Sequence, residues 1–206
     1  MARKYDATRR GEAAKRTREA IVDAAFKLHG LGIIDYEALA AEANVSLPTI
    51  RKYFPTREAL YENCTAWGMR YAAMPDLDLL AATNDARDRL RLAVRETFAF
   101  YESLFGQLWA TYLYQAGSPV LTRLLGQIEE LQKRIVDLVL AAWMPVGASA
   151  EEARGLLTGL ISFLTYRALR HEGGLSPEQA TERIAEALLT SLEAIPRPGG
   201  KEAANA

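Results

Sequence analysis

Apolar residues in this chain fall mostly at helical spacing. In the stretch after Asp35 they recur three and four residues apart, on one face of a helix, at Tyr36, Leu39, Ala40 and Ala43. Asn44 then suits the left-handed residue that ends a helix, because a short polar side chain tolerates a positive φ. The pattern predicts a short helix over residues 36–43, followed by a tight turn.

A second short helix is predicted over residues 47–54. Ser46 can cap it by accepting a hydrogen bond from a free backbone N–H, and Pro48 falls in its first turn, where no intrahelical N–H is needed. Its inner face consists of Ile50, Tyr53 and Phe54, and its outer face of Leu47, Pro48, Thr49, Arg51 and Lys52. Because a major groove admits a short helix that presents small and cationic side chains, residues 36–54 predict a helix-turn-helix.

The rest of the chain predicts an all-α protein of about nine helices. Six of the other seven are expected over residues 12–28, 57–73, 106–115, 119–143, 149–171 and 177–194. The seventh is a long helix with an apolar stripe from Leu90 to Phe105. Residues 75–85 read as a connector. We expect four segments: a basic arm and DNA-binding head (1–55), a connecting helix (56–74), a helical effector-binding and dimerisation domain (75–195) and a disordered tail (196–206).

Two stretches of the head resemble the TetR (tetracycline-repressor-like) family of bacterial transcriptional regulators. Residues 44–60 (NVSLPTIRKYFPTREAL) are similar to its recognition-helix region, and residues 17–25 (TREAIVDAA) to its first helix. Asn44 stands where glycine is usual, Arg51 stands where tyrosine is frequent, and residues 27–35 form a shorter stretch than is usual.

The resemblance implies a homodimer whose two heads bind double-stranded DNA. It assigns phosphate contacts to Tyr53 and Arg57 and a capping role to Ser46. The motif positions favour base-edge contacts for the front of the second helix, with Arg51 contacting either a base or a phosphate. The expected DNA-binding set is Ser46, Leu47, Pro48, Thr49, Arg51, Lys52, Tyr53 and Arg57.

Charge is distributed unevenly along the chain. The formal net charge is −1, but residues 1–73 carry twelve Lys/Arg against nine Asp/Glu, and residues 1–18 carry seven against two. This asymmetry is typical of a protein with a DNA-facing end. A basic arm also fits a disordered, solubilising tail, and the adjoining helix-turn-helix favours phosphate contact.

The last two predicted helices indicate a dimer. Apolar residues surround much of the helix over 149–171, and the last helix carries a narrower stripe. Since one chain of this size would struggle to cover both helices, a two-fold interface is expected, as the resemblance also implies. Its residues would be Leu157, Leu160, Ile161, Leu164, Ile184, Leu188 and Leu192. The alternative is a helix central to its own domain.

Aromatic residues between positions 98 and 166 allow an apolar pocket with a few polar groups. The resemblance implies a small-molecule effector in this region; a filled core is the alternative. The candidate lining is Phe98, Tyr101, Glu102, Phe105, Trp109, Tyr112, Gln115, Trp143, Phe163 and Tyr166, with Gln107 and Thr111 as further polar candidates.

The residues offer little support for catalysis, a cofactor or a metal. His29 and His171 lie far apart without ligand spacing, and each suits a helix end, where positive charge is favourable. Cys64 is the sole cysteine and reads as a small buried hydrophobe. No signal peptide or membrane span is recognised, so a cytoplasmic location is expected.

The sequence therefore predicts a ligand-responsive, DNA-binding transcriptional regulator. We expect a repressor that a small, largely apolar effector releases from a near-palindromic operator. The alternatives are an architectural or division-linked DNA binder without an effector, a small-molecule-binding protein that has lost DNA recognition, and an α-helical enzyme.

Overall fold

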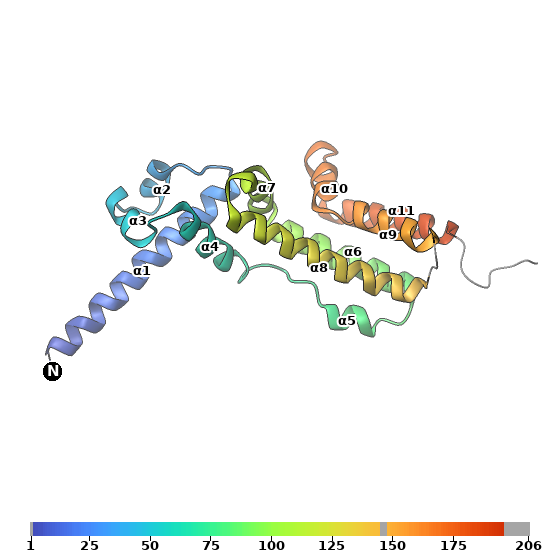
Figure 1. The fold of residues 1–206 in the computed structure, drawn as a ribbon, viewed down its shortest axis with the longest axis horizontal. Coiled ribbons are helices and arrows are strands. Elements are labelled where there is room, and N and C mark those ends of the chain that lie inside the picture. The colour runs from blue at the N-terminus through green and yellow to red at the C-terminus, as the bar shows by residue number, and fades with distance from the viewer. Residues whose placement is uncertain (1, 145–147, 196–206) are drawn as a thin grey trace, which may run out of the picture. The chain divides into compact units, whose positions relative to one another are not determined.

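A computed structural model describes residues 2–144 and 148–195, with side chains from residue 9 onward and without that of residue 148. The described part consists of helices joined by short connections, so the all-α prediction is confirmed (Figure 1). It contains eleven α-helices: α1 Ala2–Gly30, α2 Tyr36–Glu42, α3 Leu47–Tyr53, α4 Arg57–Gly68, α5 Leu77–Ala82, α6 Ala86–Ser103, α7 Phe105–Tyr114, α8 Pro119–Trp143, α9 Ala148–Leu160, α10 Phe163–Arg167 and α11 Pro177–Ala194. A 3₁₀ turn (η1, Gln115–Gly117) follows α7, and a π-helical turn (η2, Ala168–Glu172) follows α10.

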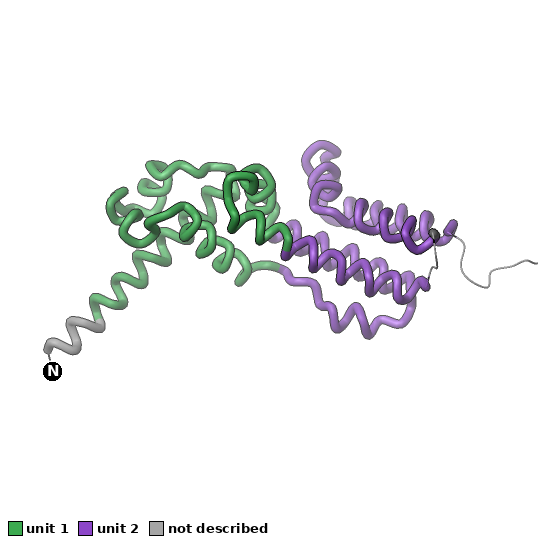
Figure 2. The backbone as a smooth tube through the Cα atoms, viewed as in Figure 1, with its two compact units in different colours: residues 1–72, 104–126 green, residues 73–103, 127–206 purple. Residues whose placement is uncertain are grey.

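The chain forms two compact units (Figure 2). Unit 1 comprises residues 1–72 and 104–126, and unit 2 comprises residues 73–103 and 127–206. The expected C-terminal domain ran from residue 75 to 195, yet residues 104–126 of that span belong to unit 1 with the helix-turn-helix. The predicted tail, residues 196–206, lies outside the described residues.

Several helix ends form where the local sequence predicts them. Ser46, Thr56 and Ser176 each cap a helix by accepting a hydrogen bond from the backbone N–H three residues on. Asn44 has the expected positive φ, at 51°. The Gly173-Gly174 pair ends a helix, with Gly174 at φ 65°.

Other helix boundaries differ from the prediction. α1 extends back to Ala2, so the expected arm is part of a helix. Asp76 caps a short helix, α5, inside the expected connector. The expected helix over residues 149–171 is divided at Ser162, whose hydroxyl accepts from the Thr165 N–H at 3.2 Å and caps α10. A side chain that bonds the backbone in this way competes with continuation of the helix.

Unit 1 is built around α1. Its buried residues Ile21 and Ala25 pack with Ile50 and Phe54 from the end of α3 and with Leu60 of α4. The start of α7 also packs on the end of α1, because Gly106 permits a very close approach. A Cβ at Gly106 would lie 2.1 Å from the carbonyl oxygen of Gly30. The glycine is therefore required by this packing.

Unit 2 packs α6 against α10 and α11. Its centre is an aromatic group, in which Phe98 lies 4.5 Å from Tyr166 and Tyr101 lies 5.6 Å from Phe163, between ring centroids. A buried arginine, Arg89, ties the surrounding backbone together. It donates hydrogen bonds to the carbonyls of Ala81, Thr83 and Leu138. Since these carbonyls accept its charge-assisted bonds, the guanidinium is satisfied without a carboxylate.

Candidate functional site

The helix-turn-helix of unit 1 is formed by α2 and α3. Asp35 caps α2 by accepting from the Ala38 N–H at 2.8 Å, and the turn passes through Asn44 in the left-handed region. Ser46 then accepts from the Thr49 N–H at 3.3 Å and starts α3. Ile50 anchors α3 to the core with no exposed surface. These local bonds and this anchor determine which side of α3 faces outward.

The expected DNA-binding residues divide into two groups by exposure. Leu47, Thr49 and Tyr53 are half-buried, and Leu47 and Tyr53 pack against the core of unit 1. The exposed residues are Ser46, Pro48, Arg51, Lys52 and Arg57. The front of α3 is therefore cationic at its C-terminal end, through Arg51 and Lys52, and small at its N-terminal end. Much of Leu47, expected to face outward, is used in packing.

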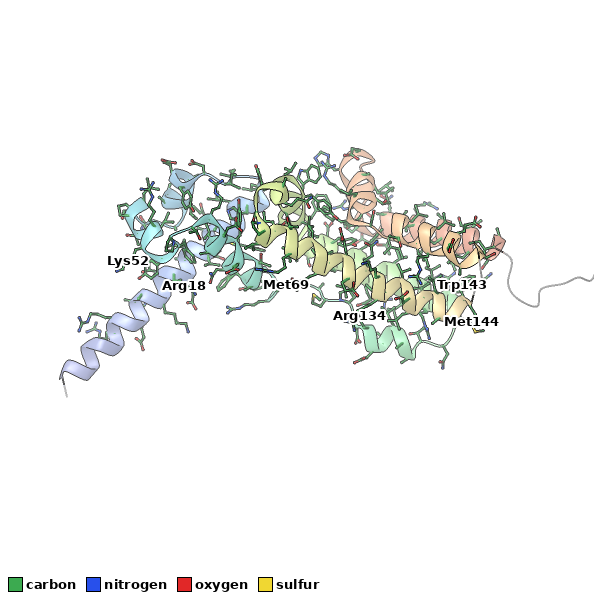
Figure 3. All side chains as sticks on the ribbon, viewed as in Figure 1. Arg18, Lys52, Met69, Arg134, Trp143 and Met144 are labelled. Carbon is green, nitrogen blue, oxygen red and sulfur yellow. The ribbon has the colours of Figure 1, made fainter. Side chains whose placement is uncertain are left out.

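A further cation lies beside this surface. The guanidinium of Arg18, on α1, lies 5.3 Å from the ring centroid of Phe54, the residue that ends α3. Figure 3 labels Arg18 and Lys52 on their helices within this unit. The basic run at the N-terminus was the sequence signal for Arg18, but its proximity to the end of α3 depends on the packing of α1. We define the cationic front as Arg18, Arg51, Lys52 and Arg57.

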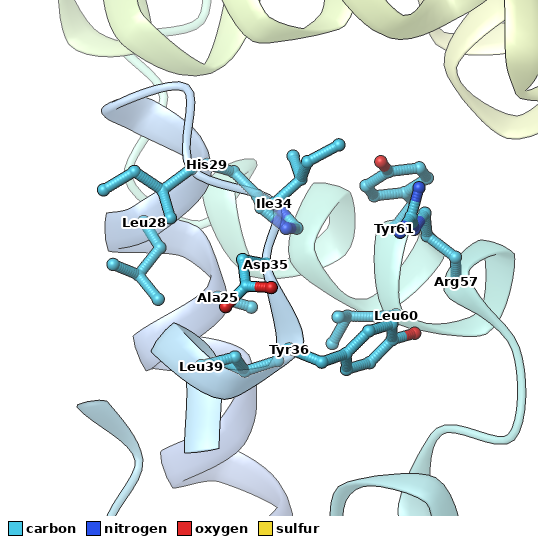
Figure 4. A pocket seen from close by; sticks show the side chains of 11 residues that line it. Ala25, Leu28, His29, Ile34, Asp35, Tyr36, Leu39, Arg57, Leu60 and Tyr61 are labelled. Carbon is cyan, nitrogen blue, oxygen red and sulfur yellow. The ribbon is translucent and has the colours of Figure 1, made fainter. Parts of the chain in front are cut away.

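Arg57 begins α4 beside a small hollow. Its guanidinium lies 5.9 Å from the ring of Tyr36, and Figure 4 shows its side chain with those of His29 and Tyr61 around the hollow. The cavity of about 10 Å³ has room for about one water molecule at most. It is a packing defect of the head and has no capacity for an organic ligand.

His29 in this hollow is neutral at neutral pH. Burial, together with the smaller effect of the positive charge of Arg57, lowers the pKa of its imidazole from 6.5 to about 4. The ring packs edge to face with Tyr61, with centroids 5.4 Å apart. We expected His29 to favour positive charge at the end of a helix; in the structure, desolvation outweighs the helix dipole.

Unit 2 contains a much larger open cavity, of about 650 Å³, between α6, α10 and the start of α11. Three of the expected pocket residues line it: Phe98, Glu102 and Tyr166. Tyr101 and Phe163 are buried in the aromatic centre, and Trp143 is buried at the end of α8 (labelled in Figure 3). The remaining four expected residues belong to unit 1: Phe105, Trp109, Tyr112 and Gln115.

The further polar candidates of unit 1 are used in its own packing. Gln107 donates a hydrogen bond to the Phe26 carbonyl at 3.3 Å, and Thr111 donates to the Gln107 carbonyl at 2.8 Å. These residues are polar candidates for the pocket because they lie near its aromatic residues in the sequence. Their partners, however, are backbone carbonyls of α1 and α7.

Glu102 is the centre of a hydrogen-bonded triad in unit 2. It accepts from the Tyr166 hydroxyl at 2.7 Å and from Arg170, at 2.9 Å from Nη2 and 3.2 Å from Nε. Burial alone would raise the pKa of Glu102, but the bonds from Arg170 and Tyr166 outweigh it and lower the pKa. The pKa of Tyr166 is raised by burial and by its bond to Glu102. The triad is thus an ionised glutamate held by two donors.

The expected dimer residues are mostly covered by their own chain. Leu164 is 51% exposed and Leu160 is half-buried. The five others are buried within unit 2: Leu157, Ile161, Ile184, Leu188 and Leu192. α9 and α11 contact each other, and α11 packs on α6, so those apolar stripes have partners without a second chain.

Metal-ligating and nucleophilic side chains can be located in the described residues. These residues contain no group of His, Cys, Asp and Glu that could hold a metal ion. Burial raises the pKa of the Cys64 thiol to about 12, which makes it a poor nucleophile. Within the same described ranges, no helix combines the length and apolar character needed to cross a membrane.

The fold is similar to those of two solved proteins. One is proposed to be a transcriptional regulator from Pseudomonas aeruginosa PAO1, with a TM-score of 0.58 and 22% identity over 89% of this chain and 91% of that chain. The other is a transcriptional regulator from Rhodococcus sp. Rha1, with a TM-score of 0.58 and 18% identity over 87% of this chain and 96% of that chain. No protein-family model and no curated protein sequence matches this chain. At these identities the likeness shows a shared fold.

Proposed function

We propose that this protein is a DNA-binding transcriptional regulator. The observation that carries the proposal is the exposed cationic front beside a capped, core-anchored α3 in the helix-turn-helix of unit 1. The similarity of residues 44–60 to the TetR-like recognition region supports it. So does the shared fold with two proteins described as transcriptional regulators.

The residues of the front would have different roles on a duplex. Pro48 and Lys52, with Thr49, would approach base edges in the major groove, and Arg51 would contact a base or a phosphate. Arg57, Tyr53 and Ser46 would position the head on the backbone. The exposed Arg18 adds a phosphate contact from α1 that was not in the expected set. Phosphate contacts would set affinity and register, whereas base contacts would carry sequence preference.

A homodimer would present two such heads to a near-palindrome, with half-sites about 34–36 Å or a multiple of that apart. Because most of the expected apolar residues are buried, the faces available to a partner are the outer faces of α9 and α11. Each carries a row of exposed small residues: Gly155, Thr158 and Gly159 on α9, and Ala187, Thr190 and Ala194 on α11. Small side chains let helices approach closely, so we propose that α9 and α11 of two chains form a four-helix interface.

Regulation would come from a small molecule in the cavity of unit 2, whose volume of about 650 Å³ lies within the range of about 300–1,000 Å³ found for ligand pockets. A compound that binds more tightly to a dimer with misplaced heads would shift the population away from the DNA-bound form. On this basis the protein would act as a repressor that is released by its effector.

The direct test is DNA binding by the full chain. Fluorescence anisotropy with random-sequence duplexes should show weak binding whose affinity falls steeply as salt rises, and selection from a random pool should return a near-palindromic site. If folded protein bound no duplex at low salt, the proposal would be wrong. A selected site without two-fold symmetry would contradict the dimeric arrangement and leave the DNA-binding assignment intact.

A further inference from the structure

The cavity of unit 2 has a distinct distribution of charge and apolar surface. We call it the acidic groove and define it by Arg95, Phe98, Ala99, Glu102, Glu178 and Glu182, which lie on α6 and the first two turns of α11. The base of the groove is apolar, since Phe98 and Tyr166 close it with side chains that are themselves buried. Ala99 is exposed and small, and it lines the groove together with Arg95 and Ser103 of the same helix.

The charges around the groove are unevenly paired. Glu102 is neutralised by Arg170 through two hydrogen bonds, at 2.9 and 3.2 Å. Arg95, the cation of the groove, lies 3.5 Å from the carboxylate of its neighbour Glu96. Both cations near the groove therefore already have an acidic partner.

Glu178 and Glu182 remain. They lie four residues apart on α11, one turn apart on one face, and both are exposed. Glu178 accepts a hydrogen bond from the Ser176 hydroxyl at 2.8 Å, and the bonds that it receives lower its pKa, so it is ionised at neutral pH. Within residues 148–195 and 2–144, neither glutamate forms an ion pair. The groove thus combines an apolar base with two exposed carboxylates, neither of which is held in an ion pair among the described residues.

We infer that the acidic groove binds an organic cation with an apolar body, such as a lipophilic amine, quaternary ammonium or phosphonium compound. The apolar body would displace water from the space above Ala99 and the base of the groove, and its charge would lie beside Glu178 and Glu182. The groove's volume accommodates such a molecule, and an anion would meet two unpaired carboxylates. The inference that this cation acts as an effector rests on the proposed function. The inference that the groove binds it does not.

The test uses the full chain, with tetraphenylphosphonium as the cation and tetraphenylborate as an anion of the same shape, by isothermal titration calorimetry. Glu178→Gln and Glu182→Gln should each weaken phosphonium binding about fivefold, as expected for an exposed charge contact. Arg95→Gln should tighten it, because a like charge is removed. Ala99→Phe should abolish it by filling the groove. None of the glutamate changes should weaken tetraphenylborate binding.

The matched control is Glu186→Gln, an exposed glutamate one turn beyond Glu182 that does not line the groove. It should leave phosphonium affinity unchanged. Thermal unfolding of each variant identifies any loss of phosphonium affinity that reflects misfolding. Arg95→Gln is expected to increase phosphonium affinity, and misfolding cannot produce an increase. Phosphonium affinity that is the same in the wild type, the Glu178/Glu182 double variant and Ala99→Phe would overturn the inference.

A second measurement separates this inference from the proposed function. Phosphonium added to a protein–DNA complex should release the duplex in the wild type, and Ala99→Phe should prevent the release. If the cation binds in the groove but the protein binds no DNA, the inference about the groove would be supported and the proposed function would be refuted. DNA binding without groove-dependent cation binding would refute the groove alone.

Discussion

Glu58, in the first turn of α4, holds Ser118, the residue before α8. Its carboxylate accepts from the Ser118 hydroxyl at 2.7 Å and from the Val120 N–H at 3.3 Å. The Ser118 hydroxyl in turn accepts from the Leu121 N–H at 3.2 Å. Glu58 therefore satisfies the Val120 N–H in the first turn of α8 directly and holds the Ser118 hydroxyl that satisfies the Leu121 N–H. Since Glu58 follows Arg57, this contact also anchors the start of α4 beside the cationic front.

Removal of this contact should destabilise the protein. Glu58→Ala should lower the free energy of unfolding by about 2 kcal/mol. The change removes two charge-assisted hydrogen bonds and leaves the Ser118 hydroxyl and the Val120 N–H without the acceptor that Glu58 provides. Glu62→Ala is the matched control. It removes the carboxylate one turn later, which bonds Arg123 at 3.0 Å with both side chains largely exposed, and it should cost about 0.5 kcal/mol. Equal losses in urea unfolding would contradict the capping role.

The cationic front can be tested by separating affinity from specificity. Arg57→Ala should weaken binding nearly uniformly across sequences and reduce the slope of log affinity against log salt by about one. Lys52→Ala should weaken binding to the selected site by about tenfold and relax its sequence preference. Both are measured by anisotropy on the selected duplex and a random one. If affinity survives both changes, the assignment of the recognition surface is wrong.

The close contact of α1 and α7 makes a strong prediction for a glycine. Gly106→Ala should lower the free energy of unfolding by about 3 kcal/mol, because the added Cβ would lie 2.1 Å from the Gly30 carbonyl oxygen, which is backbone and has little freedom to move. Gly126→Ala, on the exposed face of α8 with nothing within 4 Å of the new Cβ, should stabilise the protein by about 0.5–1 kcal/mol. Thermal unfolding should therefore show a lower midpoint for Gly106→Ala and a higher midpoint for Gly126→Ala than for the wild type.

His29 should make stability depend on pH. Its folded pKa of about 4 lies below the unfolded value of 6.5, so its contribution is fully present above pH 6.5 and is lost as the pH falls toward 4. The wild type should lose about 3 kcal/mol across this window relative to His29→Phe. His171→Gln, which removes the exposed histidine, serves as the control. Parallel stability curves for the wild type and His29→Phe would show that the imidazole is not desolvated.

The outer face of α9 can be tested without disturbing the core. Gly155 has open space where a Cβ would lie, so Gly155→Arg should fold normally, yet it should convert the proposed dimer into monomers by light scattering. Gly155→Ala should remain dimeric. A dimer that survives Gly155→Arg would place the interface elsewhere.

Features that depend on a few neighbouring residues were predicted well. The caps at Ser46, Thr56 and Ser176 and the positive φ of Asn44 follow from bonds three or four residues apart and from the steric limits of single residues. For the same reason the two short helices of the helix-turn-helix and its cationic outer face were predicted with nearly correct bounds. The helix break at Ser162 was not predicted, because a serine is also tolerated within a continuous helix.

What depends on distant residues was decided by the tertiary structure. Residues 104–126 pack with the head because Gly106 allows α7 to approach α1, and Glu58 caps a helix that begins far along the chain. The aromatic residues predicted for one pocket belong to two units, and most of the predicted interface leucines face their own core. Helical periodicity shows that a face is buried but not what buries it. By itself, the sequence determined most of the helices, several of their ends and a helix-turn-helix, whereas three-dimensional packing decided which elements they pack against and where the groove lies.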